Sequence, residues 1–191
     1  MKNIISLAAA AAVLLSAPSF AASESDAVPG SRDSHSNVTN PPVDGLGEAQ
    51  VVGVIDEVHT GEIDAAQLAL KKSNNEAVLE FARRMIADHG DSRRRLEETG
   101  VKSGRSDVSA KLKAKHKEMG AHLSALNGPA FDRAYASAMV DGHTMVLEKT
   151  DKKLIPGAKT AALATYVQEF RTTVDSHLEH ARRLKASLGT K

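Results

Sequence analysis

The stretch LATYVQEFRTTVDSHLEHARRLKASL, residues 163–188, contains the clearest pattern in this sequence. Its apolar residues recur every three or four positions, the spacing that keeps side chains on one face of an α-helix. The recurring positions are Leu163, Tyr166, Phe170, Val174, His177, Ala181, Leu184 and Leu188. The pattern predicts a long amphipathic helix whose buried face is interrupted by one imidazole, that of His177.

The same periodicity covers most of the chain before residue 163. It predicts helices from Leu46 to a stop at Ser73-Asn74-Asn75, around residues 78–96, from about Val108 to Leu126, and from Pro129 to a stop at Pro156-Gly157. No segment alternates with a period of two, so we expect no strand. Residues 46–190 are therefore predicted to form an all-α domain, an up-down four-helix bundle with one additional short helix.

The N-terminal residues indicate export. Lys2 precedes an apolar run from Ile4 to Ala17, and Ser19-Phe20-Ala21 places small residues at the cleavage positions, which is typical of a signal peptide cleaved after Ala21. The run is shorter than the about 20 residues that span a bilayer. Residues 22–45 are rich in Ser, Pro, Asn and Asp and are expected to form a disordered linker. We expect a periplasmic or secreted protein without a transmembrane segment in the mature chain.

Composition excludes several classes of function. The 191 residues contain no Cys, which excludes disulfides, thiolate metal sites and cysteine nucleophiles. Lys and Arg number 25 against 24 Asp and Glu, so the chain lacks the basic excess typical of nucleic-acid binders. The sequence has no nucleophile elbow and no glycine-rich phosphate loop, and we therefore assign no catalytic residue.

Each of the four long predicted helices carries one metal-competent residue on its apolar face: Glu62, His89, His143 and His177. Glu62 and His89 are nearly equidistant from the Asn74-Asn75 turn, which predicts that they lie level. His143 and His177 flank the Pro156-Gly157 turn in a similar way. Three imidazoles and a carboxylate suit a divalent transition metal. Two carboxylates, those of Asp88 and Asp141, are candidates to orient the imidazoles from outside the ligand set.

Two alternatives to a metal site remain open. The four residues could form a metal-free polar layer in which Glu62 pairs with an imidazole and fixes the helix register. At least two of them could instead lie on the surface. Further imidazoles, those of His59 and His180, are expected on helix flanks or the surface.

A second pattern concerns methionine. Met85 and Met139 precede His89 and His143 by four residues, which puts a thioether and an imidazole on one helix face. The motif His116-x-x-Met119-x-x-His122 does the same on the short helix. Thioether with imidazole suits copper, especially Cu(I). The alternative is that these methionines fill gaps in the core.

Several motifs together resemble a known family. They are Gly61-Glu62, FARRMIADH at 81–89, GPAFDRAY at 128–135, AMV at 138–140 leading to His143, and HLEHAR at 177–182. Over residues 46–188 the chain resembles the exported bacterial family named domain of unknown function 4142, whose members are often labelled predicted outer membrane proteins. The resemblance implies a ferritin-like helical bundle and an envelope location, but no activity.

Individual positions follow from the resemblance. Glu62, Asp88, His89, His143 and His177 stand where the family pattern has Glu, Asp-His, His and His. The family tends to have Asp-His in the fourth helix, whereas this chain has Asp141-Gly142-His143. The paired Glu-x-x-His motifs of ferritin-like di-iron proteins are missing, so ferroxidase chemistry is not expected.

These observations lead to two hypotheses for the function. The first is an exported soluble helical protein that binds a divalent transition metal, copper or a small ligand at the Glu/His layer, in envelope stress tolerance or metal handling. The second is a non-catalytic structural or interaction module of the envelope, with an envelope protein as its partner. The sequence leaves the metal, the partner and the oligomeric state open.

Overall fold

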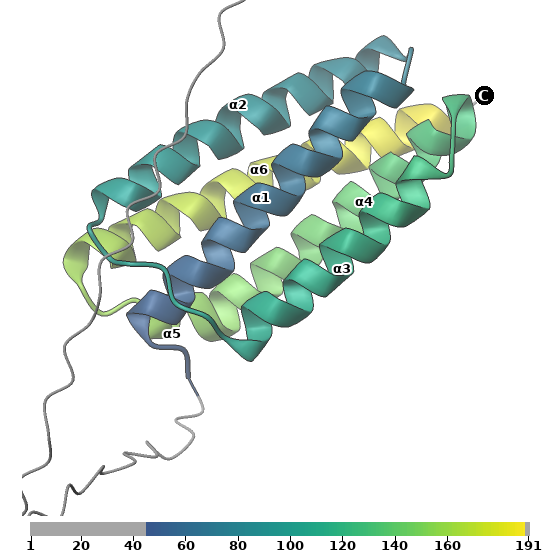
Figure 1. Cartoon of the computed structure of the whole chain (residues 1–191). Coiled ribbons are helices and arrows are strands. Elements are labelled where there is room, and N and C mark those ends of the chain that lie inside the picture. The colour runs from purple at the N-terminus through teal and green to yellow at the C-terminus, as the bar shows by residue number, and fades with distance from the viewer. Residues whose placement is uncertain (1–44, 190–191) are drawn as a thin grey trace, which may run out of the picture. The chain divides into compact units, whose positions relative to one another are not determined.

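The computed structural model describes residues 45–189, and every regular element in this range is helical (Figure 1). The elements are α1 Glu48–Lys72, α2 Glu76–Glu98, α3 Asp107–Ser124, α4 Gly128–Lys149, a π-helical turn η1 at Thr150–Leu154, α5 Ile155–Gly157 and α6 Ala161–Gly189. The prediction of an all-α fold is confirmed. The predicted signal peptide and residues 22–44 of the predicted linker lie outside the described residues.

The helix boundaries follow the predicted start and stop signals. The side chain of Asn75 accepts a hydrogen bond from the N–H of Ala77 at 3.0 Å and so caps α2. Ser106 caps α3 in the same way through the N–H of Ser109. Pro129 lies in the first turn of α4, where its missing N–H has no helical acceptor to lose.

The end of α4 differs from the prediction. The α-helix stops at Lys149 and continues through η1 and α5, so that the helical rod still ends at the predicted Pro156-Gly157. Pro156 has no N–H, and its ring would clash with the carbonyl of residue 152 in a regular α-helix. The wider π-helical turn before Pro156 accommodates this clash.

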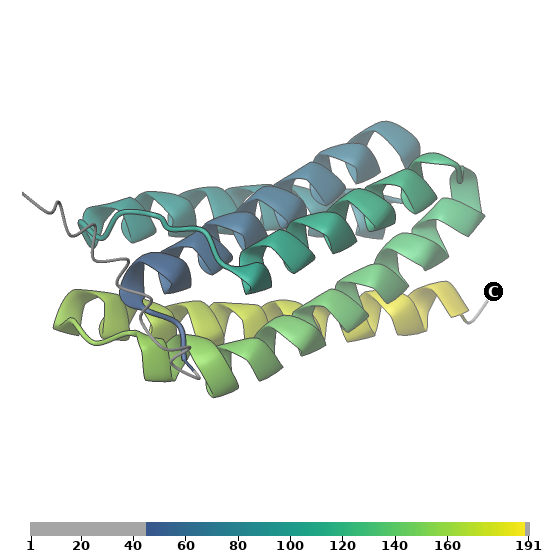
Figure 2. The same cartoon turned by 60° about the horizontal axis from the view of Figure 1, so that its bottom comes forward.

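The long helices pack side by side into a helical bundle. Helices α1 and α2 form one antiparallel pair and α4 and α6 a second, while α3 lies along α1 and α4 (Figures 1 and 2). Glu48 joins the start of α1 to the start of α6, because its Oε1 accepts hydrogen bonds from the N–H groups of Lys159 and Thr160. A membrane-crossing segment would need a long apolar helix, and residues 45–189 contain none.

The core consists of two apolar clusters with polar residues between them along each long helix. One cluster contains Val51, Ile55 and Val58 of α1 and Phe170 and Val174 of α6, among others. The other contains Met85 of α2 and Phe131 of α4, among others. The buried polar residues between the clusters are His59, Glu62, His89, Ser92, His143 and His177. We call these six residues the polar layer.

Candidate metal centre

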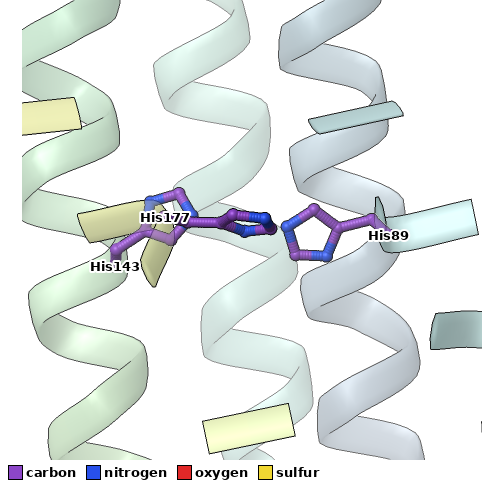
Figure 3. Close-up of side chains that lie close together, drawn as sticks. All are labelled: His89, His143 and His177. Atoms are coloured by element: carbon purple, nitrogen blue, oxygen red, sulfur yellow. The ribbon is translucent and has the colours of Figure 1, made fainter. Parts of the chain in front are cut away.

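Three imidazoles meet in the polar layer. His89 of α2, His143 of α4 and His177 of α6 are each no more than 1% exposed. One ring nitrogen from each lies within 4.8 Å of the other two. The three rings lie close together at different tilts, with centroids 5.1 Å apart for His89 and His177, 5.6 Å for His143 and His177, and 6.4 Å for His89 and His143 (Figure 3). We call these three residues the histidine triad.

Each ring of the triad has one nitrogen held by a hydrogen bond from its far side. His143 Nδ1 donates to the carbonyl of Met139 at 2.7 Å, and His177 Nε2 lies 2.9 Å from Asp88 Oδ2. The third contact joins His89 Nδ1 to His59 Nδ1 at 2.9 Å.

The second nitrogen of each ring is in a different situation. His89 Nε2, His143 Nε2 and His177 Nδ1 are buried and have no hydrogen-bond partner among residues 45–189. Because Met139 and Asp88 offer only acceptors, the held nitrogens of His143 and His177 carry the protons. The free nitrogens of these two rings therefore present lone pairs.

The His59 contact continues into a chain of hydrogen bonds. His59 Nε2 lies 2.8 Å from the hydroxyl of Tyr166, and that hydroxyl lies 2.8 Å from Ser92 Oγ. If His89 Nε2 presents a lone pair, its Nδ1–H donates to His59 Nδ1, and His59 Nε2–H then donates to Tyr166. The Tyr166 hydroxyl is left to donate to Ser92. The chain therefore links the tautomer of His89 to the direction of the hydrogen bonds through His59 and Tyr166.

Burial favours the neutral form of His59, His89 and His177. It lowers the pKa of His59 to about 3, with Arg93 and Arg95 adding to the effect. The pKa of His89 is held well below its ordinary value by burial and then by the neighbouring His59, His177 and His143. Burial also lowers the pKa of His177, although its hydrogen bond to Asp88 opposes the change. Neutral imidazole is the form that binds metals.

Glu62 is buried, at 3% exposure, but does not join the triad. The turn between α1 and α2 is centred on Asn74, and His59 and His89 are equidistant from it. The prediction that Glu62 lies level with His89 was therefore wrong by three residues. Glu62 is three residues nearer the turn, about 4.5 Å along the axis. Its Oε2 has no hydrogen-bond partner within the described chain.

The other predicted residues occupy different environments. Asp88 hydrogen-bonds to His177 and is also bound by Arg84 at 3.3 Å. Asp141 is exposed on α4, and the backbone of Met139 holds His143 in its place. Met85 and Met139 are 0% and 1% exposed and belong to the apolar cluster around Phe131.

Sequence reasoning assigned no role in the site to three members of the hydrogen-bond chain, namely His59, Ser92 and Tyr166. The expectation that His59 lies on a flank was wrong, because its side chain is fully buried. A signal was present in the sequence: Val52, Ile55, His59, Glu62, Ala66 and Ala69 follow one another at three- and four-residue steps. Two apolar series run side by side through α1, and the prediction did not use the one that contains His59.

A surface pocket of about 620 Å³ reaches the outer side of the triad. It lies between α2 and α6, and its lining includes Asp88, His177, Ser176 and Thr172. The hydrogen bond between Asp88 and His177 therefore lies where the buried layer meets solvent. Through His177 the pocket adjoins the triad.

One of three comparisons with known proteins gave a match. The family described as "Domain of unknown function (DUF4142)" matches residues 35–184. The chain belongs to this family. Comparisons with curated proteins and with solved structures gave no match. The family match covers all three residues of the triad and Glu62, His59 and Asp88 as well.

Proposed function

We propose that this protein binds one divalent transition metal ion through His89 Nε2, His143 Nε2 and His177 Nδ1. The observation that most strongly supports metal binding is that the two nitrogens of each ring have different environments. One nitrogen is held from outside by Met139, Asp88 or His59, and the other is buried without a partner in the described chain. Metal-bound histidines characteristically have their second nitrogen held in this way.

The free-energy cost of the three unpaired nitrogens in the metal-free protein also supports metal binding. A buried polar atom left without a hydrogen bond costs about 1–3 kcal/mol. Three such nitrogens lie in one layer, in rings whose positions are already restricted by hydrogen bonds. A metal ion shared by the three lone pairs removes the penalty from all of them at once.

The donor set narrows the class of metal. Imidazole nitrogen suits Zn(II), Cu(II), Ni(II) and Fe(II), whereas Mg(II) and Ca(II) prefer oxygen donors. Depressed pKa values of His89 and His177 mean that protons compete weakly with the ion for these rings. The proposed ligand is therefore a late first-row ion such as Zn(II), Cu(II) or Ni(II).

A role in the cell envelope is supported by the sequence. The signal-peptide pattern of residues 1–21 supports export to the periplasm or beyond, and the family resemblance supports a ferritin-like four-helix bundle. A soluble envelope protein with a buried nitrogen site suits metal handling or sequestration under envelope stress. No step of catalysis is required for this role.

A second candidate function is a metal-free polar layer in a structural or interaction module. The specific observation in its favour is that the hydrogen bonds of His59 to His89 and of Asp88 to His177 each join two helices. Such contacts set helix register without a metal. This candidate expects chelators to leave the melting temperature unchanged.

Titration of the full chain with Zn(II), Cu(II) and Ni(II) by calorimetry tests the proposal. We expect one ion per chain and a rise in melting temperature that a chelator reverses. Removing a residue that only hydrogen-bonds to a metal-bound histidine typically lowers the metal affinity about 10- to 100-fold. A His89→Ala/His177→Ala variant removes two proposed ligands and should lose more affinity than that. His122→Ala provides the matched control, because His122 is an exposed histidine of α3.

Two results would contradict the metal proposal. One is an unchanged melting temperature when the metal is added or removed. The other is equal affinity in wild type and the His89→Ala/His177→Ala variant, because any observed binding would then belong to surface histidines. The metal-free polar layer would remain as the function of the triad.

A further inference from the structure

A second pocket, of about 330 Å³, lies among α1, α3 and α4 and is lined by chemically unusual residues for a bundle surface. They include Glu62, His116, Met119, Asp141 and Met145. None of these residues belongs to the histidine triad. This one pocket is thus lined by two thioethers, an imidazole and two carboxylates.

The methionines of the bundle divide into two kinds. Met85 and Met139 are fully buried in an apolar cluster, as gap-filling methionines are. Met119 and Met145 are only partly buried, and both line this pocket from different helices. The two partly buried methionines of residues 45–189 pack against the edges of the apolar clusters and both line this pocket.

His116 is oriented as a ligand would be. Its Nδ1 lies 3.2 Å from Glu57 Oε1, so the carboxylate holds this nitrogen and leaves Nε2 as the other donor atom of the ring. The ring packs against Gly61, where any Cβ atom would overlap with it. The glycine makes room for the ring, and the carboxylate of Glu57 orients it at the edge of the pocket.

Glu62 provides an independent indication of a cationic ligand. Glu62 is buried, with 3% exposure, and it lines the pocket. Its Oε2 has no hydrogen-bond partner among the described residues. Its Oε1 lies 3.6 Å from the place of a Cβ on Gly142, so the missing side chain there leaves room beside the carboxylate. A buried carboxylate without a partner is satisfied by a cation.

We propose that this pocket is a second metal site, specific for a soft monovalent cation of the Cu(I) class. The Met119 and Met145 sulfurs and His116 Nε2 are the ligands, and Glu62 supplies negative charge beside the ion. Thioether donors select Cu(I) among the biological metals, which separates this site from the all-nitrogen triad. Glu62 and Asp141 outweigh the one cationic residue of the lining, Lys115, in formal charge.

The test uses anaerobic Cu(I) titration of the full chain against a colorimetric Cu(I) chelator, with Zn(II) titration in parallel. Met119→Leu/Met145→Leu keeps side-chain volume and removes both sulfurs. We expect it to lose about tenfold or more of the Cu(I) affinity, equivalent to at least about 1.4 kcal/mol, and to retain Zn(II) binding. Met85→Leu/Met139→Leu is the matched control and should retain Cu(I) affinity.

A second measurement keeps the proposal falsifiable if a variant is unstable. In the wild-type chain with labelled methionine methyl groups, Ag(I), a redox-inert stand-in for Cu(I), should shift the NMR signals of Met119 and Met145. Shifts confined to Met85 and Met139, or no shift at all, would overturn the proposal. So would a Cu(I) affinity that the Met119→Leu/Met145→Leu variant leaves unchanged while His89→Ala/His177→Ala abolishes it.

Discussion

His59 Nδ1 of α1 lies 2.9 Å from His89 Nδ1 of α2, and both side chains are buried. One of the two nitrogens must carry a proton and the other must accept it, because this distance is that of a hydrogen bond. The proton on His89 Nδ1 leaves its Nε2 free for a ligand, and the proton on His59 Nδ1 does not. The state of the triad and the direction of the hydrogen-bond chain through Tyr166 are therefore coupled.

Replacing His59 with Phe should weaken metal binding although His59 is not a proposed ligand. The ring volume is kept, but His89 Nδ1–H loses its acceptor and the tautomer with a free Nε2 loses its support. We expect the Zn(II) affinity to fall about 10- to 100-fold, as for other outer partners of metal-bound histidines. Competition with a chelator of known affinity measures the change. Tyr166→Phe, which removes only the next link of the chain, should have a smaller effect, and equal affinity in His59→Phe and wild type would contradict the coupling.

Asp88→Asn tests the hydrogen bond that holds His177 from outside the proposed ligand set. The substitution keeps the shape of the side chain and removes the carboxylate charge that accepts the proton of His177 Nε2. The Zn(II) affinity should again fall about 10- to 100-fold, and the dissociation rate of the ion should rise. Asp91→Asn, three residues along the same helix and paired with Arg94 on the surface, is the control. A similar loss in both variants would mean that general surface charge, rather than the His177 contact, sets the affinity.

Acid should destabilise the metal-free protein over a defined pH range. The pKa of His59 is about 3 in the folded state against 6.5 for an ordinary histidine, and those of His89 and His177 are also lowered. The unfolded chain therefore binds protons first as the pH falls. The contribution of these rings to stability is complete above about pH 6.5 and is lost below it, by at most about 1.4 kcal/mol per pH unit for each ring.

Urea unfolding of the chelator-treated protein between pH 7.5 and 4.5 measures this loss. His59→Phe should flatten the pH dependence, because it removes one of the rings that protonate on unfolding. A free energy of unfolding that stays constant from pH 6.5 to 4.5 would show that these imidazoles are already accessible to protons in the folded protein.

His143→Leu should separate stability from binding. The substitution removes a buried nitrogen without a partner, so the metal-free protein should be as stable as wild type or more stable. The stabilisation by metal, about 2.7 kcal/mol for wild type at a ligand concentration of 100 times Kd, should be lost. Leu163→Ala in the neighbouring apolar cluster should behave in the opposite way. It should cost about 2–5 kcal/mol in both forms and retain the metal effect. Thermal melts with and without Zn(II) compare the two variants.

Gly61→Ala should be destabilising, whereas the same change at Gly90 should not. A Cβ at Gly61 would overlap with the ring of His116, while a Cβ at Gly90 would meet nothing within 4 Å. We expect a loss of about 1–3 kcal/mol for Gly61→Ala from the forced shift of the ring. Gly90→Ala should raise stability by up to about 1 kcal/mol through helix propensity. Chemical denaturation of both variants gives the comparison, and a stabilised Gly61→Ala protein would show that α3 yields easily at His116.

The sequence alone determined the helices and most of their ends. Apolar residues at three- and four-residue steps, such as Leu163, Phe170 and Val174, bury one side of a helix wherever it packs. Asn75 and Pro129 mark boundaries through local backbone chemistry. The predicted elements were confirmed for this reason, and the departure at η1 concerned only how the chain passes Pro156. Periodicity also indicated that His89, His143 and His177 lie on buried faces.

Only the tertiary structure decided which polar residues meet. The height of a residue depends on the centre of the turn, and an error of three residues was enough to replace Glu62 with His59 beside His89. The rotation of α1 decided that Glu62 faces a pocket shared with α3 and α4, since a helix face can meet either of two neighbours. Helical spacing fixes the side on which a residue lies, but the partner across the interface depends on register and crossing angle, which no local interaction specifies.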